Sequence, residues 1–204
     1  MNLKKQAFNP YLPSWEYIPD GEPYVFGDRV YVFGSHDKYN GYVFCLGDYV
    51  CWSAPVDDMG NWRYEGVIYK KNQDPMNRDE KMCLYAPDVT VGPDGRYYLY
   101  YVLDKVSVVS VAVCDTPAGA YEFYGYVHYA DGTRLGEKEG DEPQFDPGVL
   151  TEGNKTYLYT GFCPCTNLIW KCMNCGTATI AVVLVTLEKS TIPNAKASKY
   201  PAII

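Results

Sequence analysis

Three aspartates recur at equivalent places in the sequence. Asp20, Asp88 and Asp146 each stand seven residues before a glycine, and a short aromatic stretch follows each glycine. The aspartates are 68 and 58 residues apart, a spacing typical of toroidal repeat proteins in which every sheet contributes one loop to a shared centre. We therefore expect several carboxylates to converge at one place, where each disfavours the ionisation of its neighbours.

The sequence around these aspartates predicts β-structure throughout. Alternating or β-branched stretches, separated by glycine and proline turns, predict strands, and helix signals are scarce. The run at 106–113 is continuous, which indicates a strand buried on both faces. The expected strands lie near residues 29–33, 42–44, 49–53, 62–68, 96–102, 106–113, 121–127, 156–158 and 179–187.

Three short motifs resemble a known family. Ile-Pro-Asp-Gly-Glu-Pro at 18–23, Tyr-Ala-Pro-Asp at 85–88 and Phe-Asp-Pro at 145–147 are each followed by a glycine turn and an aromatic strand. Over roughly residues 8–162 the chain resembles the first three blades of glycoside hydrolase family 43. That family has a five-bladed β-propeller and includes arabinofuranosidases, xylosidases and arabinanases.

The resemblance implies an all-β chain that holds about three of five blades. As one partial propeller domain over 1–204, it would have its first blade at about 18–70, its second at about 85–130 and its third at about 143–204, irregular at 163–177. The implied activity is hydrolysis of arabinose- or xylose-containing glycosides. The expected partner is then a pentose-containing oligosaccharide or polysaccharide, and no cofactor is expected.

The resemblance also implies an inverting mechanism, in which Asp20 is the general base and Asp146 raises the pKa of the general acid and orients it. An inverting site needs an ionised carboxylate and a protonated carboxylic acid roughly 6.5–9.5 Å apart, so that water fits between them. Asp88 matches a second-blade position beside the pocket and is expected to contact substrate. The alternative for any one of these aspartates alone is a turn residue that caps its own backbone.

Four further residues are candidates for substrate binding. Glu22, His36 and Asp37 lie on nearby loop ends of the first repeat and either hydrogen-bond sugar hydroxyls or satisfy loop backbone. Trp15 is a candidate floor of the pocket, because aromatic rings stack on sugars, although packing is the commoner use of such a ring.

The general acid of the family is a glutamate that follows the third-blade aspartate. Glu188 is the only glutamate after Glu152, and it lacks the apolar, glycine-rich setting that this acid usually has, so the role is not assigned to it. We therefore expect a fragment of a glycoside hydrolase without its acid. The alternative is a non-catalytic carbohydrate-binding or interaction module on the same scaffold. Open blade edges would favour self-association.

Two close pairs of cysteines, Cys163 with Cys165 and Cys172 with Cys175, fall in the irregular stretch. Four thiolates can bind zinc, but the first spacing is tighter than in common zinc ribbons, and a locally altered sequence is the alternative. The remaining cysteines are expected to be reduced and buried.

The charge balance excludes one class of partner. With 18 Lys and Arg against 25 Asp and Glu, the net charge is −7, which repels nucleic-acid phosphates. No apolar run is long enough for a membrane span, and no signal-peptide pattern follows the basic N-terminal residues. These features predict a soluble cytoplasmic chain, with most of its 21 tyrosines packed in strands.

Overall fold

The computed structural model describes residues 10–141, 143–161, 181–186 and 202–203, which form three β-sheets. The first sheet contains β1 (Glu22–Phe26), β2 (Arg29–Gly34), β3 (Tyr49–Pro55) and β4 (Arg63–Tyr69). The second contains β5 (Asp88–Val91), β6 (Tyr97–Val102), β7 (Val109–Cys114) and β8 (Glu122–Tyr126). The third has the order β10 (Gly148–Glu152), β11 (Lys155–Thr160), β12 (Ala181–Thr186), β13 (Ala202–Ile203) and β9 (His128–Tyr129).

Helix is confined, within the described residues, to two single 3-10 turns at Lys71–Gln73 and Pro75–Asn77. They lie in the connection between the first and second sheets. None of the described residues forms a helix long enough to cross a membrane.

Each sheet begins with a tight hairpin closed by the predicted glycine turn. β1 pairs with β2, β5 with β6 and β10 with β11, all antiparallel. Gly27, Gly95 and Gly153 have φ of 64°, 82° and 61°, a region that costs glycine no steric strain. The glycines recognised in the sequence therefore set the same turn three times.

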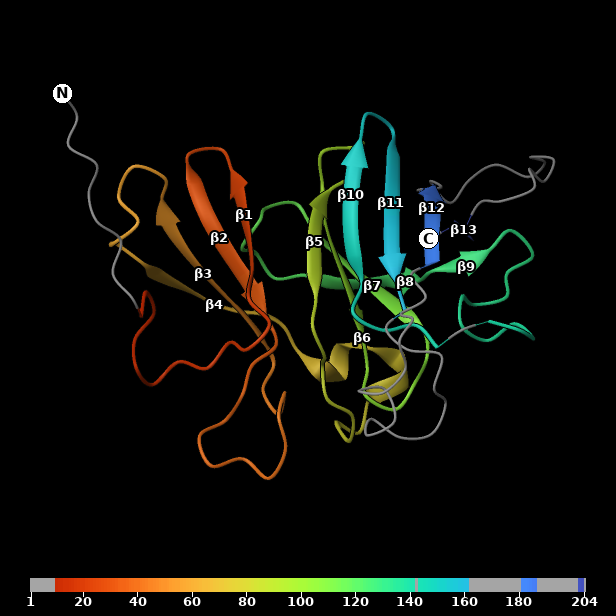
Figure 1. Ribbon diagram of the computed structural model, residues 1–204, viewed down its shortest axis with the longest axis horizontal. Coiled ribbons are helices and arrows are strands. Elements are labelled where there is room, and N and C mark those ends of the chain that lie inside the picture. The colour runs from red at the N-terminus through yellow and green to blue at the C-terminus, as the bar shows by residue number, and fades with distance from the viewer. Residues whose placement is uncertain (1–9, 142, 162–180, 187–201, 204) are drawn as a thin grey trace, which may run out of the picture.

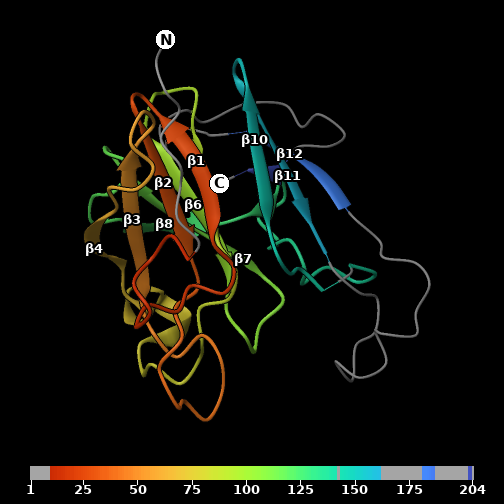
Figure 2. The same cartoon turned by 60° about the vertical axis from the view of Figure 1, so that its left-hand side comes forward.

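The first strands of the three sheets lie next to one another. In Figure 1, the arrows of β1, β5 and β10 all point upward, with β5 between the other two, so the three strands begin at their lower ends. Figure 2 shows the same sheets turned, with β10 and β11 standing to the right of β1. The N-terminal ends of these strands carry the three aspartate turns, so the arrangement brings the turns to one edge.

The second sheet is buried on both faces, as predicted for the run at 106–113, although β7 begins only at Val109. Leu99 and Tyr101 of β6 pack with Phe33, Tyr49 and other residues of the first sheet. Tyr98 and Tyr100, which alternate with them, pack on the opposite face with Val149 and Leu158 of the third sheet. Burial of aromatic and branched side chains at these two sheet-on-sheet interfaces is the main stabilising term that positions the turns.

The predicted strand at 42–44 is absent. These residues lie in the loop between β2 and β3, and Tyr42 is 90% exposed. Asn40 has φ of 56°, and the Asp37 carboxylate accepts a hydrogen bond from the Cys45 amide at 2.5 Å. Because these local contacts fold the loop back on itself, the alternation of its side chains does not produce a strand.

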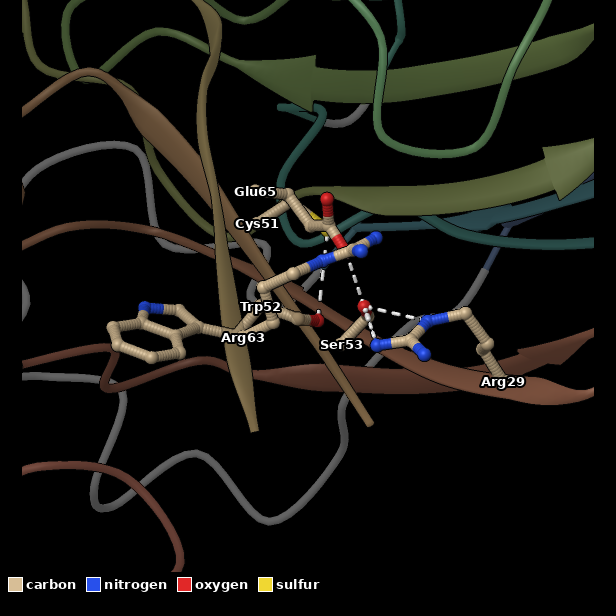
Figure 3. Close-up of polar contacts among 6 residues, drawn as sticks. All are labelled: Arg29, Cys51, Trp52, Ser53, Arg63 and Glu65. Atoms are coloured by element: carbon tan, nitrogen blue, oxygen red, sulfur yellow. Dashed lines mark hydrogen bonds and ion pairs between the residues drawn. The ribbon is translucent and has the colours of Figure 1, made fainter. Parts of the chain in front are cut away.

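Ser53 is fully buried at the centre of a polar cluster on the first sheet. Figure 3 shows its hydroxyl between the Arg29 guanidinium and the Glu65 carboxylate. Arg29 donates from Nε and Nη2 at 3.0 and 2.8 Å, Ser53 donates to Glu65, and Arg63 pairs with the same carboxylate at 2.7 Å. Since Arg29 begins β2, the cluster ties β2, β3 and β4 at the end of the sheet away from the aspartate turn.

Candidate active site

A hollow of about 510 Å³ lies where the three aspartate turns meet. It is lined by Pro19, Asp20, Gly21, Glu22, Ala86, Pro87, Asp88, Asp146, Pro147 and Gly148. Each sheet contributes the residues just before or at the start of its first strand. The expected convergence of Asp20, Asp88 and Asp146 is therefore found in the structure.

The Asp20 carboxylate is held by the residue that follows the second strand of its own hairpin. The Ser35 hydroxyl, directly after β2, donates to Asp20 Oδ2 at 2.6 Å. Ser35 is fully buried, so the bond fixes the carboxylate relative to the first sheet. Sequence reasoning missed Ser35, although antiparallel pairing of β1 with β2 places the residue after β2 beside the turn before β1.

Asp88 is 5% exposed and lies deepest of the three. Its Oδ1 accepts from the Tyr24 hydroxyl at 2.6 Å and from its neighbour's amide, Val89, at 2.7 Å. Its Oδ2 accepts from the Val149 amide at 2.6 Å. Burial raises the pKa of Asp88 to about 6, although all three donors favour the ionised form, and the charge of Glu22 raises it further.

Asp146 has an unusual backbone conformation for a residue that precedes proline. Its φ is 42°, whereas a residue before proline is normally extended. Burial, followed by the negative charge of Asp20, raises the pKa of Asp146 to about 6. The negative charge of Asp20 thus acts on Asp146 across the pocket.

Glu22 lines the pocket, but the described lining residues do not include Trp15, His36 or Asp37. Trp15 is 65% exposed and packs against Trp52, with ring centroids 5.8 Å apart. Asp37 accepts the loop hydrogen bond from Cys45 described above. The contacts of Asp37 and Trp15 correspond to the structural alternatives left open by the sequence, a loop hydrogen bond for Asp37 and ring packing for Trp15.

His36 is engaged by a residue that sequence reasoning missed. Its Nε2 lies 2.7 Å from Glu16 Oε1, and the Trp52 indole donates to Glu16 Oε2, also at 2.7 Å. The Glu16 side chain is only 3% exposed. Glu16 therefore links the N-terminal segment to the first sheet through both Trp52 and His36.

The described residues contain no group of three or more His, Cys, Asp and Glu side chains arranged to hold a metal ion. The proposed zinc ligands Cys163, Cys165, Cys172 and Cys175 lie outside the described residues, as does Glu188. Of the remaining cysteines, Cys45, Cys51 and Cys83 are free and buried, and Cys114 is free and half-buried. Burial raises the pKa of Cys45 to about 11, which makes it a poor thiolate ligand at neutral pH.

Residues 17–182 match the family model described as glycosyl hydrolases family 43. The chain belongs to glycosyl hydrolase family 43. Its three sheets are therefore blades of the five-bladed β-propeller that characterises this family, and the pocket lies where the first strands of those blades begin.

Two curated relatives illustrate the similarity. The chain is 80% identical over 162 residues to a xylosidase/arabinosidase of Thermoclostridium stercorarium, a match that covers 79% of this chain and 34% of that protein. It is 31% identical over 116 residues to xylosidase/arabinosidase 43A of Humicola insolens, covering 52% of this chain and 34% of the relative. The chain thus spans about a third of the length of these relatives.

Solved structures agree on the fold. A family 43 arabinoxylan arabinofuranohydrolase from Bacillus subtilis superposes with a TM-score of 0.61 at 22% identity, over 86% of this chain and 39% of that one. An α-L-arabinofuranosidase from Clostridium thermocellum gives 0.54 at 23% identity, over 81% and 50%. At these identities the likeness establishes the propeller architecture alone.

Proposed function

We propose that this chain forms part of the active site of an inverting glycoside hydrolase that acts on arabinose- or xylose-containing glycosides. The observation that carries the proposal is the convergence of Asp20 and Asp146, from the first and third blades, in one pocket. The names of the similar proteins, xylosidases and arabinosidases, support a pentose substrate. A hollow of about 510 Å³ is within the usual size of a small-ligand site.

Asp20 is proposed as the general base. Among the described residues, Ser35 is its only hydrogen-bond donor, and it engages Oδ2. Oδ1 is then available to accept a proton from the attacking water. A general base must lie within hydrogen-bond reach of that water, and the Ser35 bond restricts where the carboxylate can be.

Asp146 is proposed to orient the general acid and to keep it protonated. Above pH 6 or so Asp146 carries a negative charge, and a negative charge nearby disfavours ionisation of a second carboxyl group. We assign none of the described residues as the acid itself, and Glu188 lies outside them. We therefore propose that this polypeptide alone works without efficient protonation of the leaving group.

The absence of an efficient general acid is tested by comparing substrates with different leaving groups. General acid assistance is typically worth about 10² to 10⁴-fold in rate, and a nitrophenolate needs it least. We expect the 204-residue polypeptide to cleave 4-nitrophenyl arabinofuranoside or xyloside slowly, and an unactivated pentose oligosaccharide at least roughly 100-fold more slowly. Proton NMR of the released sugar should show inverted anomeric configuration.

Asp20→Asn should lower the rate on the nitrophenyl substrate by about 10²-fold or more, because the base is removed. Asp57→Asn, on an exposed turn of the first sheet, is the matched control and should leave the rate unchanged. Equal rates in both variants would refute the proposed base. Asp20-dependent cleavage of the unactivated substrate at an ordinary glycosidase rate would mean that these 204 residues contain an acid. Sugar binding without any turnover would favour the non-catalytic carbohydrate-binding module instead.

A further inference from the structure

Asp88 is bonded to all three blades at once. Tyr24 belongs to β1, Val89 to β5 and Val149 to β10, and each donates to the Asp88 carboxylate at 2.6–2.7 Å. These distances are in the range of charge-assisted hydrogen bonds. Tyr24 and Val149 lie 64 and 61 residues away in sequence, so one buried side chain joins distant parts of the chain.

The contact to Val149 holds the turn that carries Asp146. Val149 is three residues after Asp146, and Gly148 lies between Asp88 and Tyr159, close enough that an added Cβ would be 4.0 Å from Asp88 Oδ2. Asp146 has φ of 42°, a conformation that costs a non-glycine residue free energy and persists only where its surroundings fix it. The hydrogen bond from Val149 supplies such a constraint.

The contact to Tyr24 holds the other wall of the pocket. Tyr24 is two residues after Glu22 on the same strand, so the two side chains point to the same face of β1. Burial of Asp88 leaves it 5% exposed, and three of the roughly four acceptor sites of its carboxylate are used within the protein. Little of this carboxylate remains for a sugar hydroxyl.

We propose that Asp88 is a positioning residue, which links the first and third blades to the second and thereby fixes the peptide that carries Asp146. This role replaces the direct substrate contact expected from the sequence. The catalytic importance of Asp146 rests on the proposed function. The hydrogen bonds that link Asp88 to Tyr24 and Val149 can be measured without any turnover.

The test uses Asp88→Asn and Tyr24→Phe, with Tyr98→Phe as the control. Asparagine keeps the size of the side chain but replaces one accepting oxygen by an NH₂ group that cannot accept. Tyr24→Phe removes one donor and leaves the Asp88 charge in place. Tyr98 donates to Asp94 at 2.9 Å in the second blade. Its phenylalanine variant keeps the ring that packs with Val149 and loses only the same kind of hydrogen bond, at a residue that does not line the pocket.

The first readout is hydrogen exchange of the Val149 amide, compared with amides of β7 in the middle of the second blade. In Asp88→Asn we expect exchange at Val149 to become roughly 10- to 100-fold faster, as for loss of a hydrogen bond to a charged group. The β7 amides should keep their wild-type protection. Equal acceleration of Val149 and β7 would mean general destabilisation and would overturn the proposal.

The second readout is the titration of the Asp146 carboxyl carbon by NMR. In both Asp88→Asn and Tyr24→Phe we expect its midpoint to fall from about 6 toward the ordinary aspartate value, because the freed turn gains solvent. Tyr98→Phe should not move it. If Asp88→Asn fails to fold, Tyr24→Phe still tests the proposal. Because Tyr24→Phe keeps the Asp88 carboxylate, a shift of the Asp146 midpoint in this variant would reflect the lost link between blades and not the removal of the Asp88 carboxylate. An unmoved midpoint in Tyr24→Phe would overturn the inference, whether or not the chain hydrolyses any glycoside.

Discussion

At the scale of single residues, Asp146 combines an unfavourable backbone conformation with an unfavourable charge. Its φ is 42°, and burial together with the charge of Asp20 raises its pKa to about 6. Both features cost folding free energy at neutral pH. Their presence at one residue that lines the pocket is typical of a functional site, where residues needed for the reaction often reduce the folding stability.

The sign of the pH effect follows from this raised pKa. An unfolded aspartate titrates near 3.9, so the folded state binds the proton more tightly. The contribution of Asp146 to stability is therefore complete below about pH 4 and is lost as the pH rises through about 6. Asp88 shifts in the same direction, so the two effects add.

Asp146→Asn should therefore be more stable than wild type at pH 7, and its free energy of unfolding should vary less between pH 4 and 7. Asparagine also tolerates positive φ better than most residues. Urea denaturation at four pH values within this window measures the effect, with Asp57→Asn as the control. A variant less stable than wild type at pH 7 would contradict the assigned direction.

At the scale of elements, the connection between β4 and β5 is anchored by one buried carboxylate. Asp74 is fully buried and accepts from the Met76 amide at 2.8 Å. It also accepts from the hydroxyls of Tyr101, Ser110 and Tyr126, on β6, β7 and β8, at 2.7, 2.8 and 3.1 Å. One residue thus attaches the crossing segment to three strands of the second blade.

Asp74→Ala should destabilise the protein by about 3 kcal/mol or more, because it leaves several buried hydroxyl donors without their acceptor. The loss is measured by urea denaturation. Asp79→Ala is a matched control in the same connection, since Asp79 is exposed and pairs only with Lys81 among the described side chains, and it should be nearly neutral. A loss below about 1 kcal/mol for Asp74→Ala would show that the network adapts.

At the scale of the whole molecule, the third blade presents apolar side chains to solvent. Its inner face packs Val149 and Leu158 against the second blade. On the opposite face Leu150 pairs with Tyr157 across the hairpin, and Tyr159 lies two residues further along β11. Leu150 and Tyr159 are 48% and 40% exposed, which favours association through this face.

We expect sedimentation velocity to show concentration-dependent association of the 204-residue chain. Leu150→Lys should weaken it, because a charge on this face must be desolvated on contact. Tyr39→Ser changes an aromatic residue that is 85% exposed in the loop between β2 and β3 and should have no effect. A compact monomer at every concentration would argue against association through the third blade.

The sequence by itself determined the parts of this protein that depend on neighbouring residues. Alternating side chains and glycine turns follow local sterics, so the three hairpins and the blade repeat were readable, and the repeat in turn placed Asp20, Asp88 and Asp146 together. Local reasoning failed at 42–44, where contacts within the loop outweigh strand alternation.

Only the tertiary structure decided which partner each polar side chain takes. His36 meets Glu16 from 20 residues away, and Asp88 meets Tyr24 and Val149 from 64 and 61 residues away. Such pairs form because buried polar groups must be satisfied by whatever donors the packed sheets bring near. Packing between sheets sets those distances, and no local pattern in the sequence encodes them.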